Sequence, residues 1–191
     1  MAKREIRNLT LAAMFLAIGL VLPLLFGQIP EIGQRLLAMH IPVLLCGLIC
    51  GKKFGFAVGL ILPLLRFAIF GIPPIVPMGI AMSLELATYG FVIGWLYHSS
   101  KWQCIVALYR SMIIAMIAGR AVFIPVWMIV TGISGTGVNT WAFAFTSAFI
   151  TALPGILLQL ALIPAIMIAL DKTGAFPFKS KHHKEKQSLS E

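Results

Sequence analysis

Three ionisable side chains lie inside long apolar segments of this sequence, and their chemistry needs an explanation. Glu85 stands in the run "SLELATYGF" (83–91), Arg66 in the preceding apolar segment and Arg120 in the following one. A charged side chain at the centre of a membrane-spanning helix costs roughly 2.5–3.5 kcal/mol on insertion scales. Such a residue therefore needs either a partner or a functional role.

The order of the segments places these charges at similar depths if successive helices cross a membrane in opposite directions. Arg66, Glu85 and Arg120 then all lie in the middle-to-outer part, and either arginine can be the partner of Glu85. Two arginines against one glutamate leave one positive charge, which a ligand carboxylate would match because guanidinium binds carboxylate in bidentate fashion. Two other interpretations stay open: a purely structural ion pair, and an Arg66 that reaches the outer headgroups.

Polar and aromatic residues near these charges extend the candidate site. Met78, Met82, Glu85 and Tyr89 follow one face at helical spacing; such a stripe is more often packing, but the glutamate within it favours a site. Hydrogen bonds and stacking around a small polar ligand require further side chains, and Asn139, Trp141 and Gln159 are the candidates for these contacts. His40, in "MHIP", is interpreted as an interfacial residue. The predicted substrate-binding residues are Arg66, Met82, Glu85, Tyr89, Arg120, Asn139, Trp141 and Gln159.

The sequence lacks the motifs of the common catalytic and nucleotide-binding sites. It contains no G-x-x-x-x-G-K-[ST] and no H-E-x-x-H, and no Ser/His/Asp set is suggested. Cys46, Cys50 and Cys104 have no histidine or carboxylate beside them at ligand spacing, so we interpret them as packing residues. We therefore expect no catalytic residues, no metal site and no cofactor.

Composition indicates an integral membrane protein. Of 191 residues, 60% are hydrophobic and only 11% are charged, and the mean hydropathy is +0.98, which excludes an ordinary soluble domain. The formal net charge of +9 is interpreted as a topology signal, not as affinity for nucleic acid. We predict an all-α polytopic protein with a single membrane domain over 1–175 and a basic, disordered tail over 176–191.

Turn-forming residues divide the chain into six apolar segments. Lysine and arginine gather at the two termini and in the turns after the second and fourth segments, so both termini are predicted to be cytoplasmic. No cleavage pattern follows the first segment, which is expected to remain as a helix. A break is expected at Pro154-Gly155. The predicted helices cover 8–26, 36–50, 54–70, 77–97, 104–131 and 141–170.

Small residues recur at every fourth position in two places. One set is Gly47, Gly51, Gly55 and Gly59, and the other is the pair Ala13 and Ala17. This spacing lets helix backbones approach closely in lipid. Both internal packing and docking to another membrane protein explain it.

Several stretches together resemble a known family. They are "HIPVLLCGLICGKKFGFAVGLILPLLR", "GIPPIVPMGIAMSLELATYG", "IAGR" and "LPGILLQLALIPAI", and the A-x-x-x-A of Ala13 to Ala17 matches the family's most general motif. Over about residues 8–171 the chain resembles a substrate-binding S component of an energy-coupling factor (ECF) vitamin transporter. It looks closest to the pantothenate-type and pyridoxine-type members.

The resemblance implies a function. Such S components bind a vitamin with high affinity in the bacterial cell membrane, and a transmembrane T component and two ATP-binding cassette ATPases are their partners. Ala13 and Ala17 would contact the T component, and external loops at about 27–38, 71–77 and 132–140 would cap the ligand. The S component would topple in the bilayer during transport. The spare positive charge favours pantothenate, which carries a carboxylate; riboflavin, folate and hydroxymethylpyrimidine stay open.

Two other function classes fit parts of the sequence. A proton-coupled carrier of a small organic anion would use Glu85 as its titrating group, although no inverted repeat is evident. A membrane enzyme would need a catalytic set, and none was found.

Overall fold

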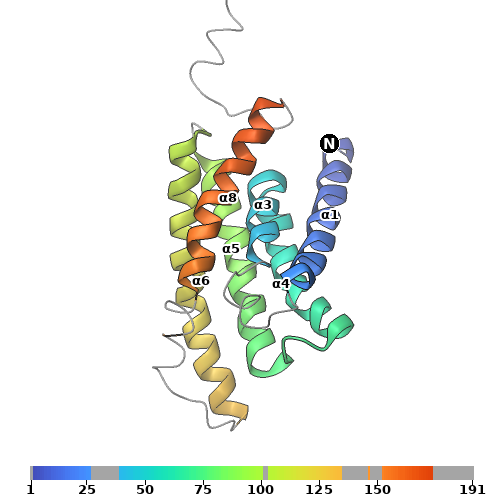
Figure 1. Cartoon of the computed structure of the whole chain (residues 1–191), viewed down its shortest axis with the longest axis vertical. Helices are drawn as coiled ribbons and strands as arrows, with labels where there is room; N and C mark the ends of the chain where they lie inside the picture. Colours follow the sequence, from blue (N-terminus) through green and yellow to red (C-terminus); the bar gives the residue numbers. More distant parts are fainter. Residues whose placement is uncertain (1, 27–38, 101–102, 135–145, 147–151, 174–191) are drawn as a thin grey trace, which may run out of the picture.

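The protein is a bundle of α-helices (Figure 1). The computed structural model describes residues 2–26, 39–100, 103–134, 146 and 152–173, and this part of the chain contains no β-strand. The predicted all-α fold is therefore confirmed. The helices in chain order are α1 (Ala2–Phe26), α3 (His40–Cys50), α4 (Lys52–Phe70), the short η1 (Ile75–Gly79), α5 (Ile80–Ser99), α6 (Ile105–Ser134) and α8 (Leu153–Lys172).

Five stretches of these helices are long and apolar enough to cross a membrane: Lys3–Pro23, Lys52–Phe70, Ile75–Ser99, Ile105–Ile133 and Leu153–Lys172. The sixth apolar helix, α3, has only 11 residues and spans about 16 Å at 1.5 Å per residue. That length is about half of the roughly 30 Å hydrocarbon core. The pattern is that of a polytopic membrane protein.

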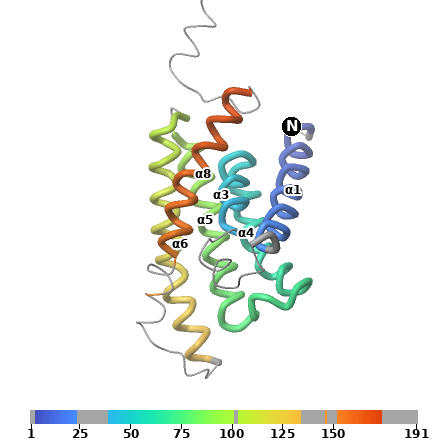
Figure 2. The backbone as a smooth tube through the Cα atoms, viewed as in Figure 1, coloured from blue at the N-terminus to red at the C-terminus, as the bar shows by residue number. Residues whose placement is uncertain are grey.

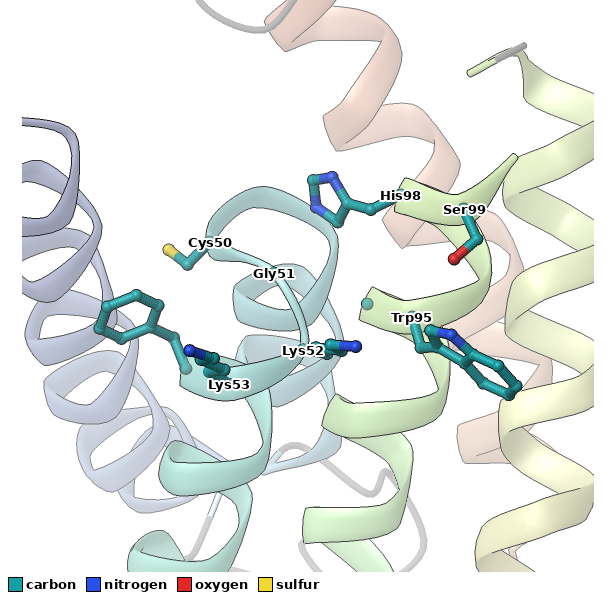
Figure 3. Close-up of a pocket in the computed structure, with 9 residues that line it drawn as sticks. Cys50, Gly51, Lys52, Lys53, Trp95, His98 and Ser99 are labelled. Atoms are coloured by element: carbon teal, nitrogen blue, oxygen red, sulfur yellow. The ribbon is translucent and has the colours of Figure 1, made fainter. Parts of the chain in front are cut away.

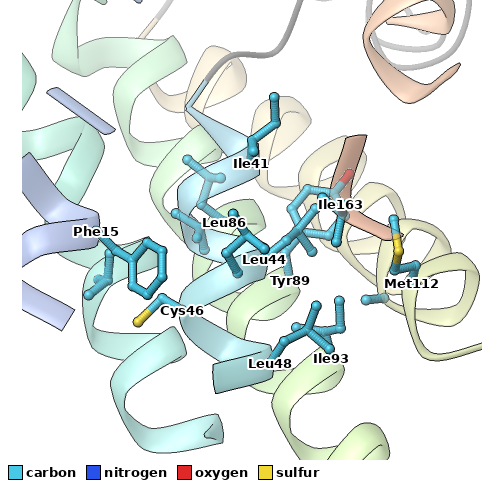
Figure 4. Packing of buried hydrophobic residues seen from close by; sticks show 14 of the residues in the cluster. Phe15, Ile41, Leu44, Cys46, Leu48, Leu86, Tyr89, Ile93, Met112 and Ile163 are labelled. Carbon is cyan, nitrogen blue, oxygen red and sulfur yellow. The ribbon is translucent and has the colours of Figure 1, made fainter. Parts of the chain in front are cut away.

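The short helix α3 lies at the centre of the bundle (Figure 2). It contacts α1, α4, α5 and α8, and every residue except Ile49 is buried. Leu44 and Leu48 of α3 belong to the same core cluster as Leu86 of α5 and Ile163 of α8 (Figure 4). Because protein covers α3 on all these sides, it does not need the length of a lipid-exposed span.

Glycines bring α4 and α5 into backbone contact. A methyl group on Gly55 would lie 2.6 Å from the carbonyl oxygen of Gly90, and one on Gly94 would lie 2.6 Å from the amide nitrogen of Lys52. A methyl group on Gly59 would collide with the backbone of Leu86. Three of the four glycines in the repeat, Gly47, Gly55 and Gly59, therefore serve internal packing.

The helix ends differ from the predicted ones. The first helix starts at Ala2 instead of 8, since four of the five residues at 3–7 are lysine, arginine or glutamate, which are good helix formers. In the fourth segment, Pro77 belongs to η1 and the regular helix α5 starts at Ile80. The expected break at Pro154-Gly155 coincides with the start of α8, whose first turn accommodates the proline. Residues 36–38 and most of 141–151 lie outside the described part.

One end of the bundle carries most of the described basic residues. The start of α1, the α3–α4 junction and the ends of α5 and α8 lie together there, at the top of Figure 1. This end contains Lys3, Arg4, Arg7, Lys52, Lys53 and Lys172. The predicted one-sided distribution of positive charge agrees with this arrangement.

Candidate functional site

A buried ion pair joins α5 to α6. The Nη1 atom of Arg120 lies 2.8 Å from Oε1 of Glu85, and both side chains are almost completely shielded from solvent. Glu85 therefore has an arginine partner, as predicted from the sequence, and this partner is Arg120. In a low-dielectric interior such a pair is stable only while both members are present.

Tyr89 stabilises the carboxylate from the same helix. Its hydroxyl donates a hydrogen bond of 3.0 Å to Oε1 of Glu85, one turn away. Gly119 lies against the phenol ring, since a methyl group there would be 2.8 Å from a ring carbon. The absence of a side chain at 119, next to Arg120, thus makes room for Tyr89 between α5 and α6.

His40 faces the same carboxylate from α3. Its Nε2 atom lies 4.0 Å from Oε1 of Glu85, and its ring meets that of Tyr89 edge-on, with centroids 5.3 Å apart. Only 2% of His40 is exposed, so its interpretation as an interfacial residue is wrong. The physical reason is the burial of α3, which brings even its first residue inside the bundle.

Arg120 retains hydrogen-bonding capacity beyond the ion pair. Its Nε and Nη2 atoms are buried and have no hydrogen-bond partner in the described part of the protein. These two atoms form one edge of the guanidinium group, with two parallel N–H bonds. Such an edge is suited to both oxygens of one carboxylate.

An apolar cluster lies next to the ion pair, toward the end of the bundle opposite the basic residues. Phe123 and Trp127, one and two turns after Arg120, stack with centroids 5.8 Å apart. Ala81 completes the buried cluster, and Met78 and Met82 pack against it. The Met stripe of the sequence therefore contributes to packing beside the charged group.

Arg66 does not join this group. Within the described residues it makes no salt bridge, and its Nε atom has no hydrogen-bond partner. It lies near the end of α4 and is half-buried. Of the two partners that the sequence left open for Glu85, the structure has Arg120, whereas Arg66 lies a turn from the end of its helix.

Comparison with protein families decides what kind of protein carries this site. The family model described as "ECF transporter, substrate-specific component" matches residues 7–167. The chain belongs to this family. It is thus a substrate-binding subunit of an ECF transporter, and the resemblance noted from the sequence is confirmed at that level. Comparisons with curated proteins and with solved structures gave no match.

The other predicted site residues of this S component fall into two groups. Gln159 of α8 is only 2% exposed, and its Nε2 atom has no hydrogen-bond partner in the described part. Met82 is partly buried between the main core and the aromatic cluster. Asn139 and Trp141 lie outside the described residues.

Three residues of this region were missed by sequence reasoning: His40, Phe123 and Trp127. The aromatic pair had a readable signal, since positions 123 and 127 follow Arg120 at the i+3 and i+7 spacing of one helix face. For His40 no local signal exists, because its burial depends on the neighbours of α3.

The S component contains no group of three or more metal-ligating side chains within its described residues. The alanine pair lies elsewhere, on α1: Ala13 and Ala17 are exposed, whereas Ala12 and Phe15 of the same helix are buried.

Proposed function

We propose that this chain is the high-affinity binding subunit of an ATP-driven vitamin uptake transporter and that its substrate carries a carboxylate. The proposal rests on the edge of the Arg120 guanidinium group formed by Nε and Nη2, here called its open edge. Two buried N–H groups that lack acceptors among the described residues cost free energy, of order 1–3 kcal/mol for each unsatisfied group. A ligand that supplies acceptors recovers that cost on binding.

The neighbours of Arg120 support a binding role. Glu85 and Tyr89 engage the Nη1 side of the guanidinium group, directly or through the carboxylate, which fixes the orientation of the opposite edge. A donor edge held in advance loses little entropy when a carboxylate arrives. Because Arg66 is not part of the group, the argument for an anion rests on this edge and not on a surplus of arginines.

Pantothenate fits this chemistry better than pyridoxine, which lacks a carboxylate. We propose that its carboxylate contacts Arg120 and that its apolar carbons face Phe123 and Trp127. Both aromatic rings are buried, so a ligand in contact with them would be shielded from solvent. The remaining predicted contacts are Met82, Asn139, Trp141 and Gln159.

Mass spectrometry of the purified chain tests the substrate class. The chain would be extracted from cells in mild detergent, and small molecules released by denaturation would be identified. We expect a stoichiometric carboxylate, depleted when Arg120→Lys is purified in parallel. A stoichiometric uncharged ligand in both proteins would contradict the proposed class.

We further propose that Ala13 and Ala17 dock to a transmembrane T component, which assembles with two ATPases in the bacterial cell membrane. Both side chains are exposed on an apolar helix face, as a docking surface requires. The termini would be cytoplasmic, and residues 1–175 would form one domain with a separate basic tail at 176–191.

A matched pair of variants tests this docking surface. Ala161 and Ala165 on α8 have the same spacing and are also exposed. We expect Ala13→Leu with Ala17→Leu to abolish co-purification of the T component while substrate binding persists. Ala161→Leu with Ala165→Leu should leave the complex intact; equal loss in both double variants would contradict the assignment.

A further inference from the structure

A cavity of about 330 Å³ lies at the basic end of the bundle, far along α5 from the Glu85–Arg120 pair. It lies where the α3–α4 junction meets the last turns of α5 (Figure 3). Its described lining residues include no acidic side chain and two lysines. They are Cys50, Gly51, Lys52, Lys53, Phe54, Gly94, Trp95, His98 and Ser99.

The polar groups of this cavity suit a phosphate. Lys52 reaches toward Trp95, and the Ser99 hydroxyl lies close by on the same side of the cavity (Figure 3). Helix α4 begins at Lys52, and no side chain in the described part of the protein caps this end; its first amides lack intrahelical acceptors. The donors that line the cavity are thus two ammonium groups, one hydroxyl and these amides, all of which suit an anion.

A column of aromatic side chains leads from the cavity along the outside of the bundle. Phe56 and Phe91 meet edge-on with centroids 6.4 Å apart, and Phe91 stacks with Trp95 at 6.5 Å. The three side chains are 40–50% exposed. Nζ of Lys52 lies 5.9 Å from the Phe91 ring centroid, so the basic group adjoins the column directly.

This combination is the profile of a lipid at a membrane surface. Exposed phenylalanines on a spanning helix face acyl chains, whereas tryptophan and lysine prefer the level of the headgroups. Clustered basic residues at the end of a membrane helix attract anionic headgroups. We propose that the cavity binds the phosphate of an anionic phospholipid, whose acyl chain lies along Phe56, Phe91 and Trp95.

Native mass spectrometry of the full chain tests this site. Phosphatidylglycerol and phosphatidylcholine with identical acyl chains would be titrated separately into the detergent-solubilised protein. We expect preferential binding of phosphatidylglycerol, and a loss of roughly tenfold or more in its affinity for Lys52→Gln with Lys53→Gln. Lys52→Arg with Lys53→Arg should keep the affinity, since the charge is retained.

The control removes two charges from the same end of the bundle but outside the cavity. Lys3→Gln with Arg4→Gln should leave phosphatidylglycerol binding within about twofold of the wild type. Trp95→Ala changes no charge and should also weaken lipid binding, because it shortens the aromatic column.

The proposal is overturned by equal affinity for the two lipids or by an equal loss in the control. Displacement of the lipid by the same concentration of inorganic phosphate would reassign the cavity to free phosphate.

Discussion

The two faces of helix α5 pack against their neighbours through different interactions. Toward α4, Gly90 and Gly94 present bare backbone to Gly55 and Lys52, and nothing larger fits. Toward α6, α5 presents Glu85 and Tyr89, which engage Arg120. One interface depends on shape alone, whereas the other depends on charge and hydrogen bonds.

This difference separates the scaffold from the site. The glycine interface has neither room nor free hydrogen-bonding groups for a ligand, because its atoms are in contact and its backbone groups are paired within the helices. The polar interface leaves two donors of Arg120 without partners among the described residues and can therefore accept a ligand. Substitutions in the two interfaces should therefore differ in their effects on stability and on binding.

The largest effect is expected from breaking the ion pair. Glu85→Gln leaves the buried charge of Arg120 without its counterion, and should lower the free energy of unfolding by about 3–5 kcal/mol. Glu85→Gln with Arg120→Gln removes both charges and should recover part of that loss. Thermal unfolding of ligand-free protein in detergent measures both variants.

The same variants address the carrier alternative. If Glu85 were the titrating group of a proton-coupled carrier, Glu85→Gln would fold normally and lose the pH dependence of uptake. A stable Glu85→Gln protein would thus argue against the ion pair as the element that holds α5 to α6.

A smaller but sharply local effect is expected at the glycine interface. Gly90→Ala introduces a methyl group against the backbone of Gly55 and should destabilise the protein by about 1–3 kcal/mol. The matched control is Gly132→Ala, because a methyl group at 132 in α6 would meet no described atom within 4 Å. Equal unfolding midpoints for the two variants would show that α4 and α5 are less tightly packed than described.

The smallest effect is expected at Arg66. Since this half-buried side chain makes no salt bridge among the described residues, Arg66→Gln should change stability by about 0.5 kcal/mol or less. Its effect on substrate binding should be far below that of the same change at Arg120. A comparable loss of binding in both variants would restore the two-arginine site expected from the sequence.

Much of the fold could be predicted from the sequence because hydropathy is a local property. The apolar segments and the need of Glu85 for an arginine both follow from the cost of placing charge in lipid. Helix ends were less predictable, since the good helix formers before residue 8 extend α1 and Pro77 delays the start of α5.

The composition of the site was harder to predict because it depends on how the helices pack. Sequence position alone could not choose between Arg66 and Arg120, since that choice is made by the approach of α6 to α5. His40 was misread because nothing local marks α3 as a central, covered helix. The glycine repeat had two interpretations until its partner, Gly90, was known.

The most direct test of the central claim is isothermal titration of purified protein with pantothenate and with the corresponding alcohol, which lacks the carboxylate. We predict that wild-type protein prefers pantothenate, and that Arg120→Lys weakens pantothenate binding by about 10- to 100-fold, the value of a charge-assisted hydrogen-bond pair. Binding of the alcohol should change little. Equal affinities for the two ligands, or equal losses in folded Arg120→Lys, would contradict a carboxylate bound at the open edge of Arg120.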